Sequence, residues 1–380
     1  MRIVSMGGGT GLSTLLQGLK GYLRDPWSGD LLDMVLQRTA GERAPVITDL
    51  CAVVAVSDDG GSSGRLRREF QVLAPGDIRN CLVALSEDEA LLSRLFQYRF
   101  SSGKGLKGHS FGNLLLTALS GVTGDFHEAV KVSCEVLAIR GRILPSTMSN
   151  ATLEAVLRGG QIVKGETQIS RSSRRIERIR LVPANCRPLP QTLEAIREAD
   201  AITVGPGSLF TSLVPNLLVR GLAREMSQSR AARIYICNLM TQPGETSSFS
   251  AADHVRALYK HSRVPLFDYV LVNTAPISPA ARRRYQKQRA QPVVLDRDEL
   301  EKLGVRVVEG SFVSEQQAGP AAARWVRHHS ERLAQAVLDI TAKHHYWSSS
   351  LKEARAPGPS EPRALATRST KKMPGNIPAK

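Results

Sequence analysis

A glycine-rich turn between an apolar run and an amphipathic segment opens the chain and constrains its fold more than any other feature. The apolar run covers residues 3–6, the turn covers residues 7–11, and the amphipathic segment begins at Leu12. Glycines let the backbone turn sharply and bring bare N–H groups against a ligand. A helix N-terminus adds unpaired donors and the positive end of a dipole, which suits a phosphate. The pattern predicts the first strand and helix of an α/β sheet, and it favours a phosphate-binding loop over a plain turn.

The spacing of these glycines differs from the standard nucleotide motifs. Gly7 and Gly9 fit the dinucleotide fingerprint G-x-G-x-x-G, but Leu12 stands where its third glycine belongs. No lysine follows the turn, so the P-loop pattern is absent as well. An NAD-type oxidoreductase is therefore disfavoured, and a nucleotide or another phosphorylated metabolite remains the expected ligand.

The chain is strongly basic, with a formal net charge of +16 over 380 residues. Much of this charge is local: it lies in residues 171–180, in residues 282–284 and in the segment from 350 to the end. Such a charge favours anionic partners. Only 5% of the residues are aromatic, and no RNA-binding signature with interleaved aromatics is present. We therefore interpret the basic stretches as solvated faces and a basic tail, and nucleic acid is an unlikely partner.

Cysteine usage and hydropathy predict a cytoplasmic protein. The five cysteines are scattered singly and form no C-x-x-C pair, which argues against a disulfide framework and a structural zinc site. A strand that begins at residue 2 leaves no room for a signal peptide, and no run of eighteen apolar residues predicts a membrane span.

The order of apolar segments predicts a Rossmann-like α/β fold, with a mostly parallel sheet flanked by helices. One domain is expected over residues 1–345, with an insertion at 22–49, a β-rich excursion at 141–182, and a disordered basic tail at 346–380. Buried strands are predicted at 3–6, 51–56, 201–204, 232–237, 269–273 and 304–308. A helix is predicted to start near Pro75 with Asp77 as its N-cap, and a late helix to cover 321–342.

Polar and glycine-rich loops follow four of the predicted strands. These loops are residues 7–11, 57–64, 205–208 and 238–242. In open α/β sheets, ligands bind beyond the carboxyl ends of the strands. We therefore expect the four loops to converge on one composite ligand site.

Roles for individual residues follow from this placement. Backbone N–H groups of the first and third loops are expected to hold phosphate oxygens. Arg79 and Asn80 are expected to reach a phosphate and a base or sugar. The ligand contacts predicted from the residues themselves are Gly7, Gly8, Gly9, Thr10, Gly11, Ser62, Arg79, Asn80, Asn113, Gly205, Gly207, Ser208, Asn238, Thr241 and Gln242.

Three acids and one histidine are the candidates for chemistry. Asp58, Asp59 and Asp77 suit Mg²⁺, which prefers one or two carboxylates together with ligand phosphates. Alternatively, one of the first pair accepts a hydrogen bond from a ribose hydroxyl, or the acids only cap turns. His109 is either a general acid or ligand donor, or a structural histidine.

Six stretches in the same order resemble a known family. They are residues 7–13, 57–66, 75–80, 108–113, 205–209 and 236–246. Together they resemble the YvcK-type gluconeogenesis factors, within the superfamily of the 2-phospho-L-lactate transferase CofD. The resemblance implies a Rossmann-like fold and a cytosolic protein that binds a UDP-sugar such as UDP-N-acetylglucosamine. It also implies a regulatory role that links gluconeogenic carbon metabolism to cell shape and cell-wall synthesis. Envelope-synthesis proteins and a second copy of the chain are the partners it suggests.

The transferase branch of this superfamily supplies the alternative. That branch transfers a phospholactyl group from a nucleotide-activated donor with Mg²⁺, and its second acidic motif usually reads Asp-Leu-Asp-Thr. Here the stretch reads Asp77-Ile78-Arg79-Asn80, which departs from that motif. Near the end, Arg327 stands where YvcK-type proteins carry an arginine implicated in UDP-sugar binding.

Overall fold

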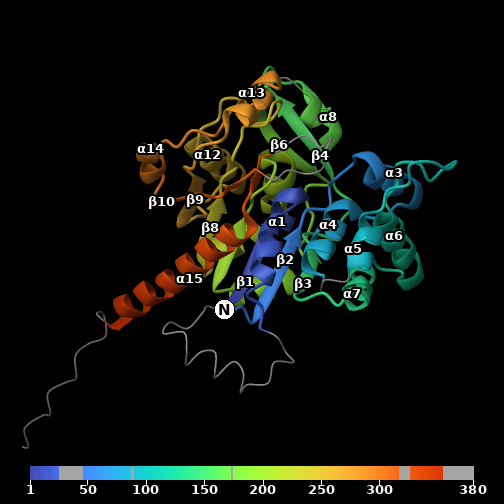
Figure 1. Cartoon of the computed structure of the whole chain (residues 1–380), viewed down its shortest axis with the longest axis horizontal. Coiled ribbons are helices and arrows are strands. Elements are labelled where there is room, and N and C mark those ends of the chain that lie inside the picture. The colour runs from blue at the N-terminus through green and yellow to red at the C-terminus, as the bar shows by residue number, and fades with distance from the viewer. Residues whose placement is uncertain (25–45, 87–89, 173, 316–325, 354–380) are drawn as a thin grey trace, which may run out of the picture.

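A seven-stranded parallel sheet forms the centre of the molecule (Figure 1). The computed structural model describes residues 1–24, 46–86, 90–172, 174–315 and 326–353. The strand order is β10-β9-β8-β7-β1-β2-β3, and each neighbouring pair is parallel. The strands are β1 (Arg2–Gly7), β2 (Asp49–Val54), β3 (Arg142–Pro145), β7 (Ala201–Val204), β8 (Ala232–Ile236), β9 (Tyr269–Asn273) and β10 (Arg306–Gly310). The predicted fold class is confirmed.

Helices cover both faces of the sheet, because its inner strands are apolar on both sides. Ile3 packs into one hydrophobic cluster and Val4 into the other. The first face carries α1 (Gly9–Lys20), α4 (Pro75–Leu85), α7 (Phe126–Val136) and α15 (Ser330–Glu353). The second carries α9 (Pro190–Glu198), α10 (Val214–Leu218), α11 (Leu222–Gln228), α12 (Ala251–Ser262) and α14 (Arg297–Lys302). The remaining helices are α3 (Gly61–Phe70), α5 (Ala90–Gln97), α6 (Phe111–Thr123), α8 (Glu166–Arg171), the π-helix η1 (Leu209–Leu213) and α13 (Pro279–Lys287).

The chain changes direction across the sheet between β1 and β7. From β1 it adds β2 and β3 on one side, and later β7, β8, β9 and β10 on the other. Such a switch point leaves a crevice at the carboxyl ends of the strands, where ligands bind. The loops after β1 and β7 therefore flank the crevice, which is the placement that the sequence predicted.

A small antiparallel sheet is inserted between β3 and β7. It pairs β4 (Thr152–Leu157) with β5 (Ile162–Lys164) and β6 (Ile176–Val182), and α8 connects the last two. The β-rich excursion predicted at 141–182 is therefore present, but its start is wrong. Residues Arg142–Pro145 form β3, the edge strand of the main sheet, because their backbone pairs with β2.

Several predicted boundaries are also corrected by the structure. Asp77 is not the N-cap of α4: Ala74 takes that position, because Pro75 begins the helix, and Asp77 lies in the first turn. Residues 346–353 belong to α15 rather than to a disordered tail, and 354–380 lie outside the described residues. The late helix begins at Ser330, preceded by the short pair β11 (Val313–Ser314) and β12 (Arg327–His328). Most of the predicted 22–49 insertion also lies outside the described residues.

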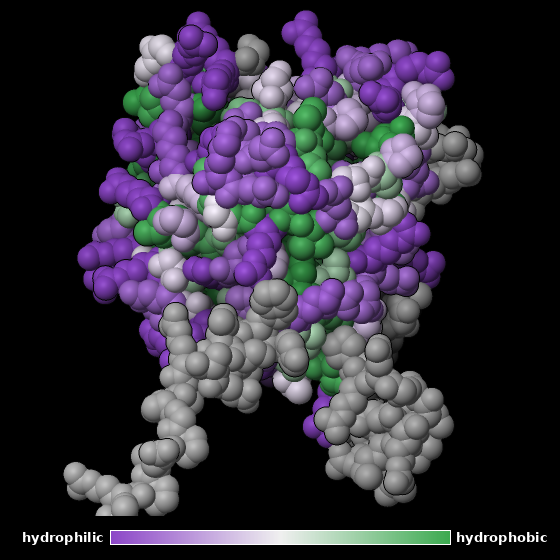
Figure 2. All heavy atoms as spheres, turned by 90° about the vertical axis from the view of Figure 1, so that its left-hand side faces the viewer, coloured by the Kyte–Doolittle hydropathy of each residue, from purple (hydrophilic) through white to green (hydrophobic). Residues whose placement is uncertain are grey.

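The described helices are too short or too polar to cross a lipid bilayer. Figure 2 shows the face that carries α14 and α15, where hydrophilic residues cover most of the surface and hydrophobic residues form a narrow strip. β10 and α15 border an apolar hollow of about 390 Å³, which Tyr269 and Phe312 help to line.

Candidate functional site

A cavity of about 700 Å³ lies at the carboxyl ends of β1, β7 and β8. The loops 7–11, 205–208 and 238–242 all contribute to its wall, so three of the four predicted loops converge. The predicted residues that line it are Gly8, Gly9, Thr10, Gly11, Asp77, Gly207, Ser208, Asn238, Thr241, Gln242 and Arg327. Its volume falls in the range of small-molecule sites, roughly 300–1,000 Å³.

The N-terminus of α1 packs directly on the loop after β7. A Cβ atom on Gly11 would lie 2.2 Å from the carbonyl oxygen of Pro206, so only glycine fits there. Thr10 and Gly11 lie in the first turn of α1, where a helix has no internal acceptors for its N–H groups. Both residues line the cavity, so this end of it suits an anion.

One backbone donor of α1 is already used by a carboxylate. Asp77 accepts a hydrogen bond from the Gly9 N–H, and a Cβ on Gly8 would lie 2.5 Å from Asp77 Oδ2. Burial, followed by the neighbouring charge of Asp58, raises the pKa of Asp77 to about 6. The carboxylate thus fixes the glycine loop against α4.

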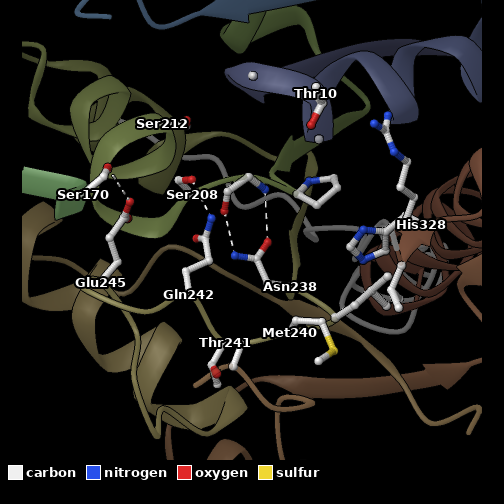
Figure 3. A pocket seen from close by; sticks show the side chains of 18 of the residues that line it. Thr10, Ser170, Ser208, Ser212, Asn238, Met240, Thr241, Gln242, Glu245 and His328 are labelled. Carbon is white, nitrogen blue, oxygen red and sulfur yellow. Dashed lines mark hydrogen bonds between the residues drawn. The ribbon is translucent and has the colours of Figure 1, made fainter. Parts of the chain in front are cut away.

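Two amide side chains hold the loop after β7 in place (Figure 3). Asn238 Oδ1 accepts from the Gly207 N–H at 3.2 Å, and Asn238 Nδ2 donates to the Gly207 carbonyl at 2.8 Å. Gln242 Nε2 donates to Ser208 Oγ at 2.8 Å. The Gly207 N–H is therefore engaged within the protein, whereas the Ser208 hydroxyl keeps its own proton for another acceptor in the cavity.

Replacing Asn238 by alanine is expected to weaken ligand binding about tenfold and to destabilise the fold. The change leaves the Gly207 N–H and carbonyl without their partner, at a cost of about 1–3 kcal/mol. Titration calorimetry and thermal unfolding of Asn238→Ala measure the two effects. Asn273→Ala is the control, because Asn273 makes analogous bonds to Phe312 N and Ala275 O after β9 and does not line the cavity. Equal loss of binding in both variants would contradict a specific role for Asn238.

A second wall of the cavity is acidic, and its main residues were missed by the sequence reasoning. Glu166 and Glu245 line the cavity together with Asp77. Burial, reinforced by the charges of Asp58 and Asp77, raises the pKa of Glu166 to about 9. Burial also raises the pKa of Glu245. Glu166 is therefore protonated at neutral pH and presents a donor as well as an acceptor to a ligand.

Glu245 joins the loop after β8 to two helices, α8 and η1. Its carboxylate accepts hydrogen bonds from the Phe210 N–H at 3.2 Å and from the hydroxyls of Ser170 and Thr211 at 3.3 and 3.4 Å. Figure 3 shows the bond between Glu245 and Ser170. The signal for Glu245 was present in the 236–246 stretch, whereas Glu166 had no sequence signal beyond its position after Gly165.

The remaining wall is less polar and comes from the last part of the described chain. Met240, Tyr285 and Val326 line the cavity there, beside Arg327 and His328. His328 Nε2 lies 3.1 Å from the Cys237 carbonyl, which can only accept, so Nε2 carries the proton. Burial lowers the pKa of His328 to about 4, and its other ring nitrogen is an acceptor at neutral pH.

The predicted acids Asp58 and Asp59 lie outside the cavity lining. Asp59 Oδ1 accepts from the Thr167 N–H at 2.9 Å and its hydroxyl at 2.8 Å, so it holds the first turn of α8. Asp58 Oδ1 accepts from the Gly60 N–H at 2.8 Å. Both therefore have structural partners, while Asp58 stays close enough to raise the pKa values of Asp77 and Glu166.

The other predicted residues form a polar cluster under α3, α4 and α6. Ser62 Oγ lies 3.0 Å from His109 Nδ1, and Arg79 donates to Ser110 Oγ at 2.8 Å and to Asn80 Oδ1 at 2.6 Å. The structure thus brings these residues together, but not at the cavity. Ser62, Arg79, Asn80, His109, Asn113, Gly7 and Gly205 do not line it.

In the described ranges, no group of three or more histidine, cysteine, aspartate or glutamate side chains is placed to hold a metal ion. The predicted trio of Asp58, Asp59 and Asp77 is therefore not such a group. The charge of Asp58 does act on Asp77, and each of these two carboxylates accepts a hydrogen bond from a backbone N–H.

Comparison with known proteins assigns the family. Residues 3–313 match the family of the 2-phospho-L-lactate transferase CofD. The chain is 42% identical over 339 residues to the gluconeogenesis factor of Bacillus subtilis, covering 89% of this chain and 98% of that one. It is 43% identical over 337 residues to the gluconeogenesis factor of Halalkalibacterium halodurans, covering 89% and 95%. A crystal structure of a Bacillus halodurans protein superposes with a TM-score of 0.79 at 43% identity, covering 89% of this chain and 99% of that one. The chain belongs to the gluconeogenesis-factor family within the CofD superfamily.

Proposed function

We propose that the cavity binds a nucleotide sugar of the UDP-N-acetylglucosamine type and that the protein is a regulatory factor. In this role it links gluconeogenic carbon metabolism to cell-shape and cell-wall synthesis. The observation that carries the binding proposal is the division of one cavity into an anion-binding end and an acidic wall. The relatives named gluconeogenesis factor support the metabolic part.

The three walls match the three parts of such a ligand. The first turn of α1 and the Ser208 hydroxyl supply donors for a diphosphate. Glu166, protonated at neutral pH, and Glu245 suit the hydroxyl and amide groups of a sugar. Met240 and Tyr285 offer an apolar surface for a base, with His328 as an acceptor for a ring N–H.

Replacing Arg327 by glutamine is expected to reduce affinity for UDP-N-acetylglucosamine about tenfold, because a hydrogen bond to a charged group contributes about 1.5–3 kcal/mol. Titration calorimetry measures the affinity. Wild-type protein should also gain about 2.7 kcal/mol of stability at ligand concentrations 100-fold above Kd. Arg332→Gln is the control, because Arg332 bonds to Ser311 and does not line the cavity. Absence of heat and of a thermal shift at millimolar ligand would contradict the proposal.

A Mg²⁺-dependent transferase is the second candidate function. The observation that favours it is the proximity of two carboxylates, since burial and then the charge of Asp58 raise the pKa of Asp77. Together with ligand phosphates, Asp58 and Asp77 would hold Mg²⁺, and the ion would stabilise charge on a transferring phosphoester. Turnover of a nucleotide-activated phosphoester that needs Mg²⁺ and is lost in Asp58→Asn would support this function. Binding without turnover across donors and acceptors would leave the regulatory role.

A further inference from the structure

A second hollow, of about 420 Å³, lies between β6, η1 and α12, and no residue that lines it also lines the cavity. Arg158, Arg175 and Lys260 border it. β6 and α12 are joined there by a hydrogen bond from the Ile179 N–H to His261 Nε2 at 3.0 Å. Figure 1 shows β6 and α12 in the upper half of the molecule, above the level of β1 and β2.

The hollow carries an excess of unpaired positive charge. Within the described ranges, Arg158, Arg175 and Lys260 form no ion pair with a carboxylate. Two acids line the hollow, Asp253 and Glu177. Asp253 already accepts from Arg256 at 3.2 Å and from the Ser250 N–H at 3.2 Å, so Glu177 is the acid that remains to balance the three cations. Three cations around a concave surface, opposed by one free acid, favour an anionic ligand.

The floor of the hollow is aromatic and fixed. Phe210 and Phe249 are in edge-to-face contact with ring centroids 6.2 Å apart, and Phe210 contacts the His261 ring at 5.8 Å. His261 is held from both sides, since Nδ1 donates to the Ala257 carbonyl at 2.7 Å and Nε2 accepts from Ile179. The Arg175 guanidinium lies 5.7 Å from the centre of the Phe249 ring, which places one cation over this floor.

We propose that this hollow is a second ligand site, for a small organic phosphate that carries a ring. Its phosphate groups would lie between Arg158, Arg175 and Lys260, and its ring would lie beside Phe249 and the Arg175 guanidinium, which covers the Phe249 ring. The volume is that of a small-molecule pocket rather than of an extended surface. Glu177 also lines the hollow and would repel a long polyanion, so a nucleic-acid strand is the less favoured occupant.

The test uses ADP and inorganic pyrophosphate as probes on the full chain. In titration calorimetry, the double variant Arg158→Gln/Lys260→Gln is expected to bind ADP at least about tenfold more weakly than the wild type, because two charged contacts are lost. Pyrophosphate, which has no ring, should bind the wild type more weakly than ADP. Arg282→Gln/Arg283→Gln, on the exposed side of α13, removes the same charge away from the hollow and should leave ADP affinity unchanged.

A variant of the first cavity separates this inference from the proposed function. Arg327→Gln should leave ADP binding at the hollow intact, whatever it does to the nucleotide sugar. The inference is overturned if ADP does not bind the wild type at millimolar concentration, or if Arg327→Gln alone removes ADP binding. It is also overturned if both double variants lose affinity equally, or if a short oligonucleotide displaces ADP at a much lower concentration than pyrophosphate does.

Discussion

Replacement of Gly11 by alanine is expected to reduce nucleotide-sugar binding by at least about tenfold and to lower stability by about 1–3 kcal/mol. The added methyl group would meet the Pro206 carbonyl at 2.2 Å, so α1 and the loop after β7 have to move apart. That loop is held by Asn238 through both polar groups of Gly207 and cannot yield freely. Titration calorimetry measures the affinity, and chemical denaturation measures the free energy of unfolding.

Gly141→Ala is the matched control for this prediction. Gly141 has a φ of 116°, and a Cβ there would lie 2.7 Å from the Leu50 carbonyl, so the variant is also strained. It precedes β3, at the end of the sheet opposite the cavity. We expect Gly141→Ala to lose stability yet keep the affinity of the folded protein. Loss of affinity in proportion to stability in both variants would show that Gly11 acts only through folding.

Replacement of Glu166 by glutamine is expected to raise the free energy of unfolding by about 2–4 kcal/mol at pH 8. The pKa of Glu166 is about 9 in the folded chain, against an ordinary value of 4.5. Between these values the native state keeps a proton that the unfolded chain has released. Stability therefore falls as pH rises through this window, and glutamine removes that loss.

The pH dependence of the stability gain distinguishes the raised pKa of Glu166 from the simple removal of a surface charge. The gain from Glu166→Gln should be small near pH 4.5 and should grow towards pH 9. Denaturant midpoints measured across that range provide the test. Glu69→Gln, an exposed change on α3, should show no such trend. A gain that does not depend on pH would contradict the raised pKa of Glu166.

Protonation of Glu166 is also expected to affect the affinity for the nucleotide sugar. In the proposed complex, a neutral Glu166 would not repel a diphosphate at the N-terminus of α1, whereas an ionised one would. Affinity for the nucleotide sugar is therefore expected to decline in the wild type above pH 9, and the decline should be weaker in Glu166→Gln. A calorimetric series from pH 7 to pH 10 measures this difference.

The main sheet and the convergence of three loops on one cavity were predictable from the sequence for a physical reason. Buried parallel strands are apolar throughout and end in glycine or polar loops, so each strand end is marked locally. Residues 7–11, 205–208 and 238–242 therefore met as predicted. The fourth loop, residues 57–64, does not line the cavity. Asp59 instead accepts a hydrogen bond from the Thr167 N–H in α8, and Asp58 accepts one from the Gly60 N–H.

The acidic wall could not be predicted, because it forms through contacts between residues that are far apart in the sequence. Nothing in the local pattern around Glu166 shows that α8 will bring it beside Asp77, from a part of the chain about ninety residues away. Likewise, the polar cluster of Ser62, Arg79 and His109 has the composition of a binding site, but packing directs these side chains to one another. Composition marks polar residues, whereas the fold decides whether they face a ligand or a protein partner.

The origin of the cavity walls has a consequence for how the family can diverge. The loops that line one end of the cavity follow strands of the main sheet, whereas Glu166 and Ser170 lie on α8, within the inserted three-stranded unit. In the proposed complex, the contacts to the phosphates and the contacts to the sugar would therefore come from separate segments of the chain. Exchange of residues 146–186 between relatives should change the preferred sugar while leaving the phosphate-binding loops intact.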